Sequence, residues 1–199
     1  MRILIIGANG TLGSKTAKEL SQRHEIITAG RNSGEIRVDI SSVDSIKNLF
    51  KNVSNIDACI CTAGTGYYGD FETLTEEKML QGIKGKLLGQ VNVVLIGQHY
   101  LNDNGSFTLV SGILAEDPAK NSTCVALING AINSFVLSAA QELKRGIRIN
   151  AISPGLVEDS FERYGKLFPG FTPVPMQKVV TGFVKSIEGA VNGKIIKIY

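Results

Sequence analysis

A glycine-rich turn at the start of the chain is the feature that most constrains its fold. The apolar run Ile3–Ile6 ends in glycines spaced three apart, and helix-forming residues follow through Leu20. Glycine tolerates unusual φ values and has no side chain, so backbone N–H groups and the positive end of the next helix can face a pyrophosphate. The pattern predicts a dinucleotide-binding strand–turn–helix, although a plain connection is the alternative. The predicted cofactor contacts in this turn are Gly7, Asn9, Gly10, Thr11, Leu12 and Gly13.

Length and composition are those of one ordinary globular domain spanning residues 1–199. Hydrophobic residues make up 43% and charged residues 20% of the chain, and no apolar run approaches the length that a bilayer span needs. With no targeting segment before the first strand, we expect a cytoplasmic protein without a membrane partner. The net charge of +3 is small and scattered, which argues against a nucleic acid as partner.

Cysteine and histidine usage gives no pattern of a metal site. The three cysteines, an odd number, argue against a disulfide framework, and Cys59 and Cys61 share one face of an apolar strand. We therefore interpret them as small core residues. His24 and His99 are far apart in the sequence, so we predict no metal.

The turn after the second predicted strand bears on the type of nucleotide. In a nucleotide fold this strand ends beside the adenosine ribose, where a carboxylate would bind the free 2′-hydroxyl of NAD. Here Arg31 and Ser33 follow the strand, and a guanidinium with a neighbouring hydroxyl can hold a 2′-phosphate. We therefore expect NADP(H) rather than NAD(H), the alternative being that Arg31 is a solvated turn residue. Asp39, at the end of the next short strand, could accept a hydrogen bond from the adenine amino group.

Apolar strand-like segments alternate with helical segments along the whole chain. The predicted strands are Ile3–Ile6, Glu25–Ala29, Arg37–Ile40, Ile56–Thr62, Phe107–Val110, Arg148–Ile152 and Lys194–Ile198. Apolar residues at helical spacing predict a helix from Val43, capped by Ser41 or Ser42, and two long helices over Leu74–Tyr100 and Ser122–Leu143. This alternation is typical of a parallel sheet covered on both faces. We expect a single-domain α/β fold with a Rossmann-like, doubly wound parallel sheet.

Small residues follow the predicted strands at the sheet edge where ligands of open α/β folds bind. The small residues at the end of one strand, Thr62, Ala63 and Gly64, would let a flat ring approach the backbone. Ser111 ends another strand. The segment Gly155–Phe168 is loop-like and could form an apolar lid over a substrate. Its lid residues would be Phe161, Tyr164, Leu167 and Phe168, although an amphipathic helix over the sheet edge would read the same way.

These features together resemble the short-chain dehydrogenase/reductase family along nearly the whole chain. The glycines look like its cofactor turn, with G-x2-G-x2-G in place of the family's G-x3-G-x-G. Asp39 resembles its adenine-side Asp, and the segment CTAG at 61–64 its N-N-A-G strand end. GIRINAISPG at 146–155 resembles its turn beside the nicotinamide, and NGKIIKI at 192–198 its closing strand. The resemblance implies further cofactor contacts at Pro154, Gly155 and Ser160.

The resemblance also implies a catalytic set in which a Tyr exchanges the proton, a Lys lowers the pKa of that Tyr, a Ser polarises the carbonyl and an Asn holds a water. When the second long helix is aligned with the family's catalytic helix, the Tyr position falls on Val125 and the Lys position on Asn129. The Ser position falls on Gly112, beside Ser111, and the Asn position on Lys86. By this alignment a Lys and an Asn have exchanged places, and Lys86 and Asn129 should face one cavity. Lys86 would then supply a cation beside the nicotinamide ribose, unless it is a solvated helix residue.

The proton donor is left open by this register. Tyr67 and Tyr68, in the loop after the strand ending at Gly64, and Tyr164 in the lid are the tyrosines expected nearby. Water or the substrate itself could also take this role. We predict a catalytic set of Ser111, Lys86, Asn129 and Tyr67.

Three functions fit these residues. The first is an NADP(H)-dependent reductase or dehydrogenase that transfers hydride between the cofactor and a small carbonyl or alcohol substrate. The second is an inactive NADP(H)-binding regulator or sensor, and the third is epimerisation or dehydration with the cofactor regenerated. The two long helices resemble the family's subunit contacts, which implies a homodimer or homotetramer.

Overall fold

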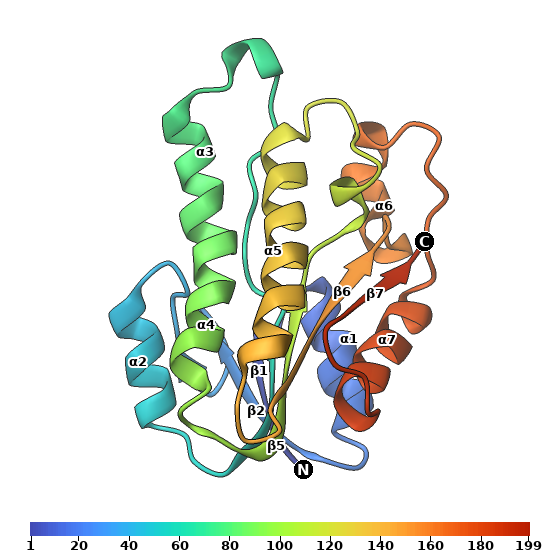
Figure 1. Ribbon diagram of the computed structural model, residues 1–199. Helices are drawn as coiled ribbons and strands as arrows, with labels where there is room; N and C mark the ends of the chain where they lie inside the picture. Colours follow the sequence, from blue (N-terminus) through green and yellow to red (C-terminus); the bar gives the residue numbers. More distant parts are fainter.

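The computed structural model covers residues 1–199 and contains one seven-stranded sheet in the order β3-β2-β1-β4-β5-β6-β7 (Figure 1). All six strand pairings are parallel, so the predicted α/β fold with a Rossmann-like parallel sheet is confirmed. The strands are β1 Arg2–Ile6, β2 Glu25–Gly30, β3 Ile36–Arg37, β4 Ile56–Cys61, β5 Leu101–Val110, β6 Arg148–Pro154 and β7 Lys194–Ile198.

Two strands, β3 and β5, differ from their predicted bounds by more than two residues at one end. β3 ends at Arg37, so the prediction of a strand through Ile40 was wrong. The Asp39 N–H donates to Ser45 Oγ, and Asp39 Oδ1 accepts from Ser41, so these residues begin the cap of the following helix instead. β5 begins at Leu101, before the predicted Phe107. Its first half consists mainly of polar residues, so the sequence showed no apolar strand pattern there.

Helices cover both faces of the sheet (Figure 1). α2 Val43–Lys51, α3 Glu76–Gly82, α4 Gly89–Gly97 and α5 Thr123–Glu142 lie on one face, and α1 Thr11–Leu20 and α7 Met176–Glu188 on the other. Along β1, Leu4 and Ile6 join the larger apolar cluster, whereas Ile3 and Ile5 join the smaller one. Alternate side chains of one strand therefore enter two cores, which explains its unbroken apolar sequence.

The predicted helix over Leu74–Tyr100 is present, but its middle is not α-helical. α3 begins after Thr75, whose hydroxyl accepts from Lys78 N, and passes into a π-helix, η2, over Ile83–Leu88 before α4. π-helical turns are rare and occur often at functional sites. This one contains Lys86.

α5 confirms the second predicted long helix, but it corrects one expectation. Its 20 residues are long and apolar enough to cross a bilayer by length and composition, which contradicts the expectation that no such run exists. Small and amide residues are interspersed among the apolar residues of α5, so the sequence does not show an unbroken apolar run. In the structure Ile128, Ile132 and Val136 of α5 pack into the core of the sheet.

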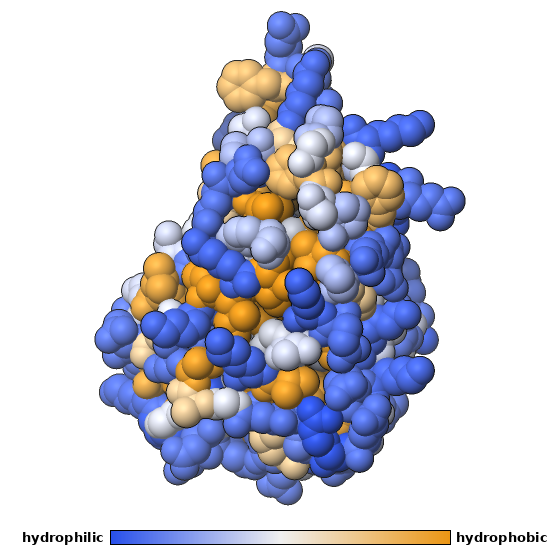
Figure 2. Space-filling view, turned by 90° about the vertical axis from the view of Figure 1, so that its right-hand side faces the viewer, coloured by the Kyte–Doolittle hydropathy of each residue, from blue (hydrophilic) through white to orange (hydrophobic).

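The predicted lid contains a short helix rather than a plain loop. α6 spans Glu158–Tyr164 and the 3-10 turn η4 spans Gly165–Leu167, before α7 and the edge strand β7. Figure 2 looks onto the side of the molecule that carries β7 and shows apolar side chains gathered in the middle of this face. β7 itself presents half-buried Ile195, Ile196 and Ile198.

Candidate active site

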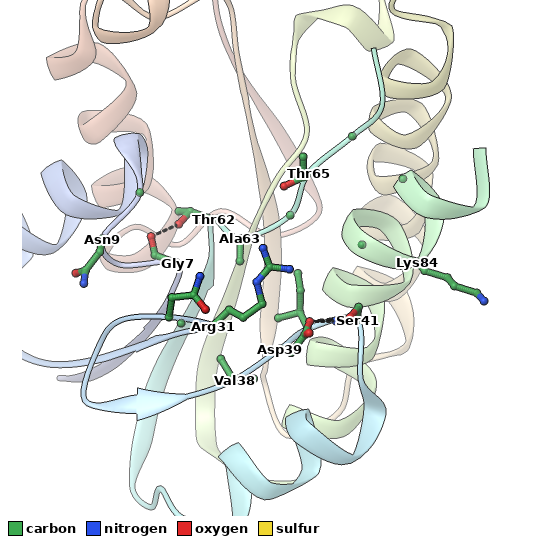
Figure 3. A pocket seen from close by; sticks show the side chains of 18 of the residues that line it. Gly7, Asn9, Arg31, Val38, Asp39, Ser41, Thr62, Ala63, Thr65 and Lys84 are labelled. Atoms are coloured by element: carbon green, nitrogen blue, oxygen red, sulfur yellow. Dashed lines mark hydrogen bonds between the residues drawn. The ribbon is translucent and has the colours of Figure 1, made fainter. Parts of the chain in front are cut away.

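A groove of about 940 Å³ runs along the carboxyl ends of β1, β2 and β4 (Figure 3). It brings together most of the predicted cofactor contacts from three separate turns. The predicted residues that line it are Gly7, Asn9, Gly10, Arg31, Ser33, Asp39, Ala63, Gly64 and Tyr67. Thr11 is exposed and Gly13 buried in the first turn of α1, next to the groove but not among its lining residues.

The glycine turn is packed too closely for side chains. A Cβ on Gly13 would lie 2.1 Å from the Gly7 carbonyl oxygen, and one on Gly7, whose φ is +89°, would lie 2.7 Å from Thr62 Oγ1. The Thr62 hydroxyl donates to the Gly7 carbonyl at 3.0 Å and joins the turn to β4 (Figure 3). Gly10 caps α1 without a side chain, and the first turn contains no acidic residue. The first amides of α1 are therefore free to bind an anion.

At the other end of the groove, Arg31 extends beside Asp39 (Figure 3). Asp39 Oδ1 accepts from the Ser41 N–H at 2.9 Å and the Ser41 hydroxyl at 2.7 Å, and these bonds together with nearby Arg31 lower the pKa of Asp39. Glu35 is tied back to β2, where its carboxylate accepts from the Thr28 N–H and hydroxyl. Its carboxylate therefore does not line the groove.

A second cavity of about 200 Å³ adjoins the groove and is mostly apolar. The two hollows share a wall, because a Cβ on Gly64 would lie 2.7 Å from Lys86 Cγ and one on Gly66 would lie 2.6 Å from Val125 Cγ2. The predicted residues that line the second cavity are Leu12, Lys86, Ser111, Asn129, Pro154, Gly155 and Ser160.

Lys86 and Asn129 face the same cavity, as predicted. Lys86 Nζ donates to Asn129 Oδ1 at 2.7 Å and to the Ser111 carbonyl oxygen at 3.3 Å. The Asn129 amide nitrogen in turn donates to the Gly112 carbonyl oxygen at 3.4 Å. The Ser111 hydroxyl is buried and has no hydrogen-bond partner. Lys86 is thus not a solvated helix residue.

Burial lowers the pKa of Lys86 to about 8. No carboxylate forms an ion pair with it, and the neighbouring Cys61 thiol is neutral because burial raises its pKa to about 12. A cation in a mostly apolar cavity without a counter-ion is costly and is typical of a functional site.

The tyrosines divide between the two hollows. Tyr67 lines the groove, packs against the main core and lies under Lys78 Nζ, 5.5 Å from its ring centre. Tyr68 and Tyr164 line the second cavity and stack on each other at 6.2 Å between ring centres. Burial and the neighbouring Tyr164 raise the pKa of Tyr68 to about 12. The predicted catalytic Tyr67 therefore lies apart from Lys86, Ser111 and Asn129.

The lid prediction is partly matched. Tyr164 and Phe168 line the second cavity. Leu167 packs against the small apolar cluster that Phe168 forms with Leu114, Val125 and Leu156. Phe161, however, is 49% exposed and takes no part in the lining. Its place on the outer side of α6 explains the difference.

Some contacts and one residue of the site were not predicted. Thr62 was expected only as a small residue at the strand end and Ser41 only as a possible helix cap. The bond from Thr62 to the glycine turn and the bonds from Ser41 to Asp39 needed the tertiary structure to be found. Lys84 lines the groove from η2, although Figure 3 shows its side chain extending away from Arg31. Its position two residues before Lys86 on a predicted helix gave no sign that both would reach the site.

Comparisons with known proteins agree with this geometry. A family model described as enoyl-(acyl carrier protein) reductase matches residues 2–182. The structure of the protein lin1944 from Listeria innocua is 46% identical, covers 100% of both chains and has a TM-score of 0.99. A small-chain dehydrogenase in complex with NADPH is 26% identical, covers 100% of this chain and 96% of its own, and has a TM-score of 0.87. The uncharacterized oxidoreductase YmfI of Bacillus subtilis (strain 168) is 27% identical over 187 residues, 89% of this chain and 70% of its own length. The chain therefore belongs to the short-chain dehydrogenase/reductase family of oxidoreductases.

Proposed function

We propose that this protein is an NADP(H)-dependent reductase or dehydrogenase that acts on a small, mostly apolar carbonyl or alcohol compound. The observation that carries the proposal is the shared wall at Gly64, where the glycine-lined groove meets a small cavity that contains the half-buried Lys86 ammonium. A nicotinamide ring at this wall would exchange hydride with a substrate carbon in the cavity.

The groove fits such a cofactor. The uncapped first turn of α1 and the glycines Gly7 and Gly10 would hold the pyrophosphate. Asp39 Oδ1 is occupied by Ser41, which leaves Oδ2 to accept from the adenine amino group. Ala63 and Gly64 would allow the nucleoside to lie against the end of β4.

Arg31 and Ser33 support a preference for NADP(H) over NAD(H). Both line the groove after β2, where their guanidinium and hydroxyl groups suit a 2′-phosphate, and the NADPH complex of the 26% identical dehydrogenase is consistent with this preference. Glu35, which could have bound a free ribose hydroxyl, is engaged by Thr28.

The substrate end of the site differs from the pattern that the family resemblance implies. Val125 and Asn129 stand where a Tyr and a Lys are expected, and Lys86 supplies the cation from the opposite helix. The unpartnered Ser111 hydroxyl is available to donate a hydrogen bond to a substrate oxygen. The cavity, at about 200 Å³, is below the usual range for ligand sites, about 300–1,000 Å³, which favours a small substrate.

The test combines cofactor binding with turnover. NADPH and NADH are titrated by nicotinamide fluorescence, and NADPH oxidation is then followed with a panel of small aldehydes, ketones and quinones. We expect tighter binding of NADPH than of NADH, and turnover with at least one apolar carbonyl compound. Tight NADPH binding without turnover across the panel would favour the second candidate function, an inactive NADP(H)-binding regulator. The observation that supports this alternative is Val125, which stands where the family resemblance implies a Tyr.

We also propose that the chain self-associates through the outer surfaces of α4 and α5. Leucines on these helices are between 43% and 52% exposed, namely Leu88 just before α4, Leu95, Leu127 and Leu137. Contiguous exposed apolar side chains often mark protein–protein contacts, and these four leucines are the residues that would form such a patch.

A further inference from the structure

The Lys86 ammonium has one hydrogen-bond donor left for a ligand. Of its three N–H groups, one donates to Asn129 Oδ1 and one to the Ser111 carbonyl oxygen, and the third has no acceptor in the protein. Because Lys86 lines the apolar cavity, a neutral substrate there would find this cation as a donor.

Asn129 and Gly112 hold the ammonium in place. The Asn129 amide nitrogen donates to the Gly112 carbonyl oxygen, which turns Oδ1 toward Lys86. Gly112 has a φ of +154°, and a Cβ there would lie 2.9 Å from the Asn129 amide nitrogen. The close approach of the amide therefore requires this glycine. On the other side, Gly64 lies against the Lys86 side chain.

We infer that Lys86 is the proton donor of the proposed reduction, with Asn129 as the residue that positions it. This inference rests on the proposed function. The carbonyl carbon of the substrate gains the hydride that the reduced nicotinamide supplies, and its oxygen takes a proton from Lys86 Nζ. One C–H bond of the reduced nicotinamide, the C=O π bond and one N–H bond of Lys86 would break, while a C–H and an O–H bond form on the substrate. The products are the alcohol, the oxidised nicotinamide and Lys86 as a neutral amine. Water returns the proton, and alcohol oxidation runs the same steps in reverse.

The alternative donors are less suited to neutral pH. Tyr68 lines the cavity, but its pKa of about 12 makes it a weaker acid than Lys86, whose pKa is about 8. Proton transfer is most effective when the pKa of the donor lies near the working pH. Tyr67 faces the groove instead of the cavity.

The electrostatic surroundings of Lys86 are neutral. The other titratable residues that line the cavity are Tyr68 and Tyr164, and the titratable neighbour of Lys86 behind it is the Cys61 thiol of β4. No carboxylate lines the cavity. The pKa of Lys86 is therefore set by burial and by its two hydrogen-bond acceptors, and a carboxylate placed beside it should raise this pKa.

The first measurement reads the proton on Lys86 without any turnover. In protein labelled with ¹⁵N-lysine, one Nζ resonance should titrate near pH 8 and be missing in Lys86→Met. In Asn129→Asp, a nearly isosteric variant, the same resonance should titrate about 1–3 pH units higher. If the Lys86 resonance titrates near its ordinary value in the wild-type protein, or does not respond to Asn129→Asp, the inference is wrong.

The second measurement separates proton donation from cofactor binding. Lys86→Met should bind NADPH within about threefold of wild type yet lose about 100-fold or more in turnover, the usual contribution of a general acid. Lys86→Arg keeps the charge but cannot release the proton, so its turnover should also fall. Lys47→Met removes an exposed lysine of α2 and should change neither value.

The outcomes distinguish the inference from the proposed function. If wild type reduces a carbonyl compound and Lys86→Met does so equally well, the inference fails and the function stands. If NADPH affinity and turnover fall together in Lys86→Met, the lysine holds the cofactor and is not the donor. If wild type turns over no compound, the proposed function fails, and the donor role fails with it even if Lys86 titrates near pH 8.

Discussion

Replacing Arg31 with alanine should change which nicotinamide cofactor binds. The guanidinium lines the groove after β2, and a hydrogen bond to a charged group contributes about 1.5–3 kcal/mol. Because Arg31 is exposed to solvent, we take the lower part of this range, about 1.5–2 kcal/mol. At about 1.4 kcal/mol per tenfold change, the Kd for NADPH should rise about 10- to 30-fold, and the Kd for NADH by less than about twofold. Fluorescence titration of both cofactors measures the two values.

Arg37→Ala is the matched control. Arg37 is an exposed residue of β3, carries the same charge and does not line the groove. It accounts for the general loss of positive charge near the site. If Arg31→Ala and Arg37→Ala weaken NADPH binding equally, or if Arg31→Ala weakens both cofactors alike, the assignment of the 2′-phosphate to Arg31 is refuted.

Three further predictions follow from packing, burial and exposure. Gly13→Ala places a Cβ 2.1 Å from a backbone oxygen, so it should lower the free energy of unfolding by about 1–3 kcal/mol and abolish saturable NADPH binding, whereas Gly130→Ala meets nothing within 4 Å and should stabilise α5 by up to about 1 kcal/mol. Urea unfolding and cofactor titration check both, and equal behaviour of the two variants would contradict the packing argument. The pKa of Lys86 is lowered to about 8 in the folded protein, so above pH 8 the unfolded chain binds more protons and wild-type stability rises with pH. Relative to Lys86→Met, the free energy of unfolding should grow by about 1 kcal/mol between pH 7 and pH 9, and a constant difference would count against a buried ammonium. Leu95→Lys should reduce self-association in sedimentation velocity, because Leu95 is 49% exposed on α4; an unchanged sedimentation coefficient would place the contact elsewhere.

The sheet was predictable because most of its strands contain apolar runs in the sequence. Ile3–Ile6 is apolar at every position, since its side chains enter two cores, and the glycines after it have a function that few other residues could fill. β3 was less accessible. Val38 and Ile40 are as apolar as strand residues, but the cap around Asp39 takes the backbone out of the sheet.

In the site, the sequence could predict which residues share a cavity, but it could not predict their distances or their pKa values. Aligning two helices with a family pattern was enough to bring Lys86 and Asn129 into one cavity, yet the 2.7 Å bond and the shifted pKa depend on burial that only folding creates. Tyr67 and Tyr68 are neighbours in one loop, and the sequence offers no reason to send the first to the groove and the second to the cavity. Tertiary contacts with Lys78 and Tyr164 decide their directions.

The π-helical segment η2 has a consequence for how this site could be lost. A π-turn contains a surplus residue compared with α-helix, so α3 and α4 are out of phase by about 100°, the rotation that one residue makes. Deletion of one residue within Ile83–Leu88 would let the helix run from α3 to α4 as regular α-helix, without an interruption. The domain should still fold, but Lys86 would turn away from Asn129. The position of the Lys86 cation and the stability of the scaffold are thus separable here by a single in-frame deletion.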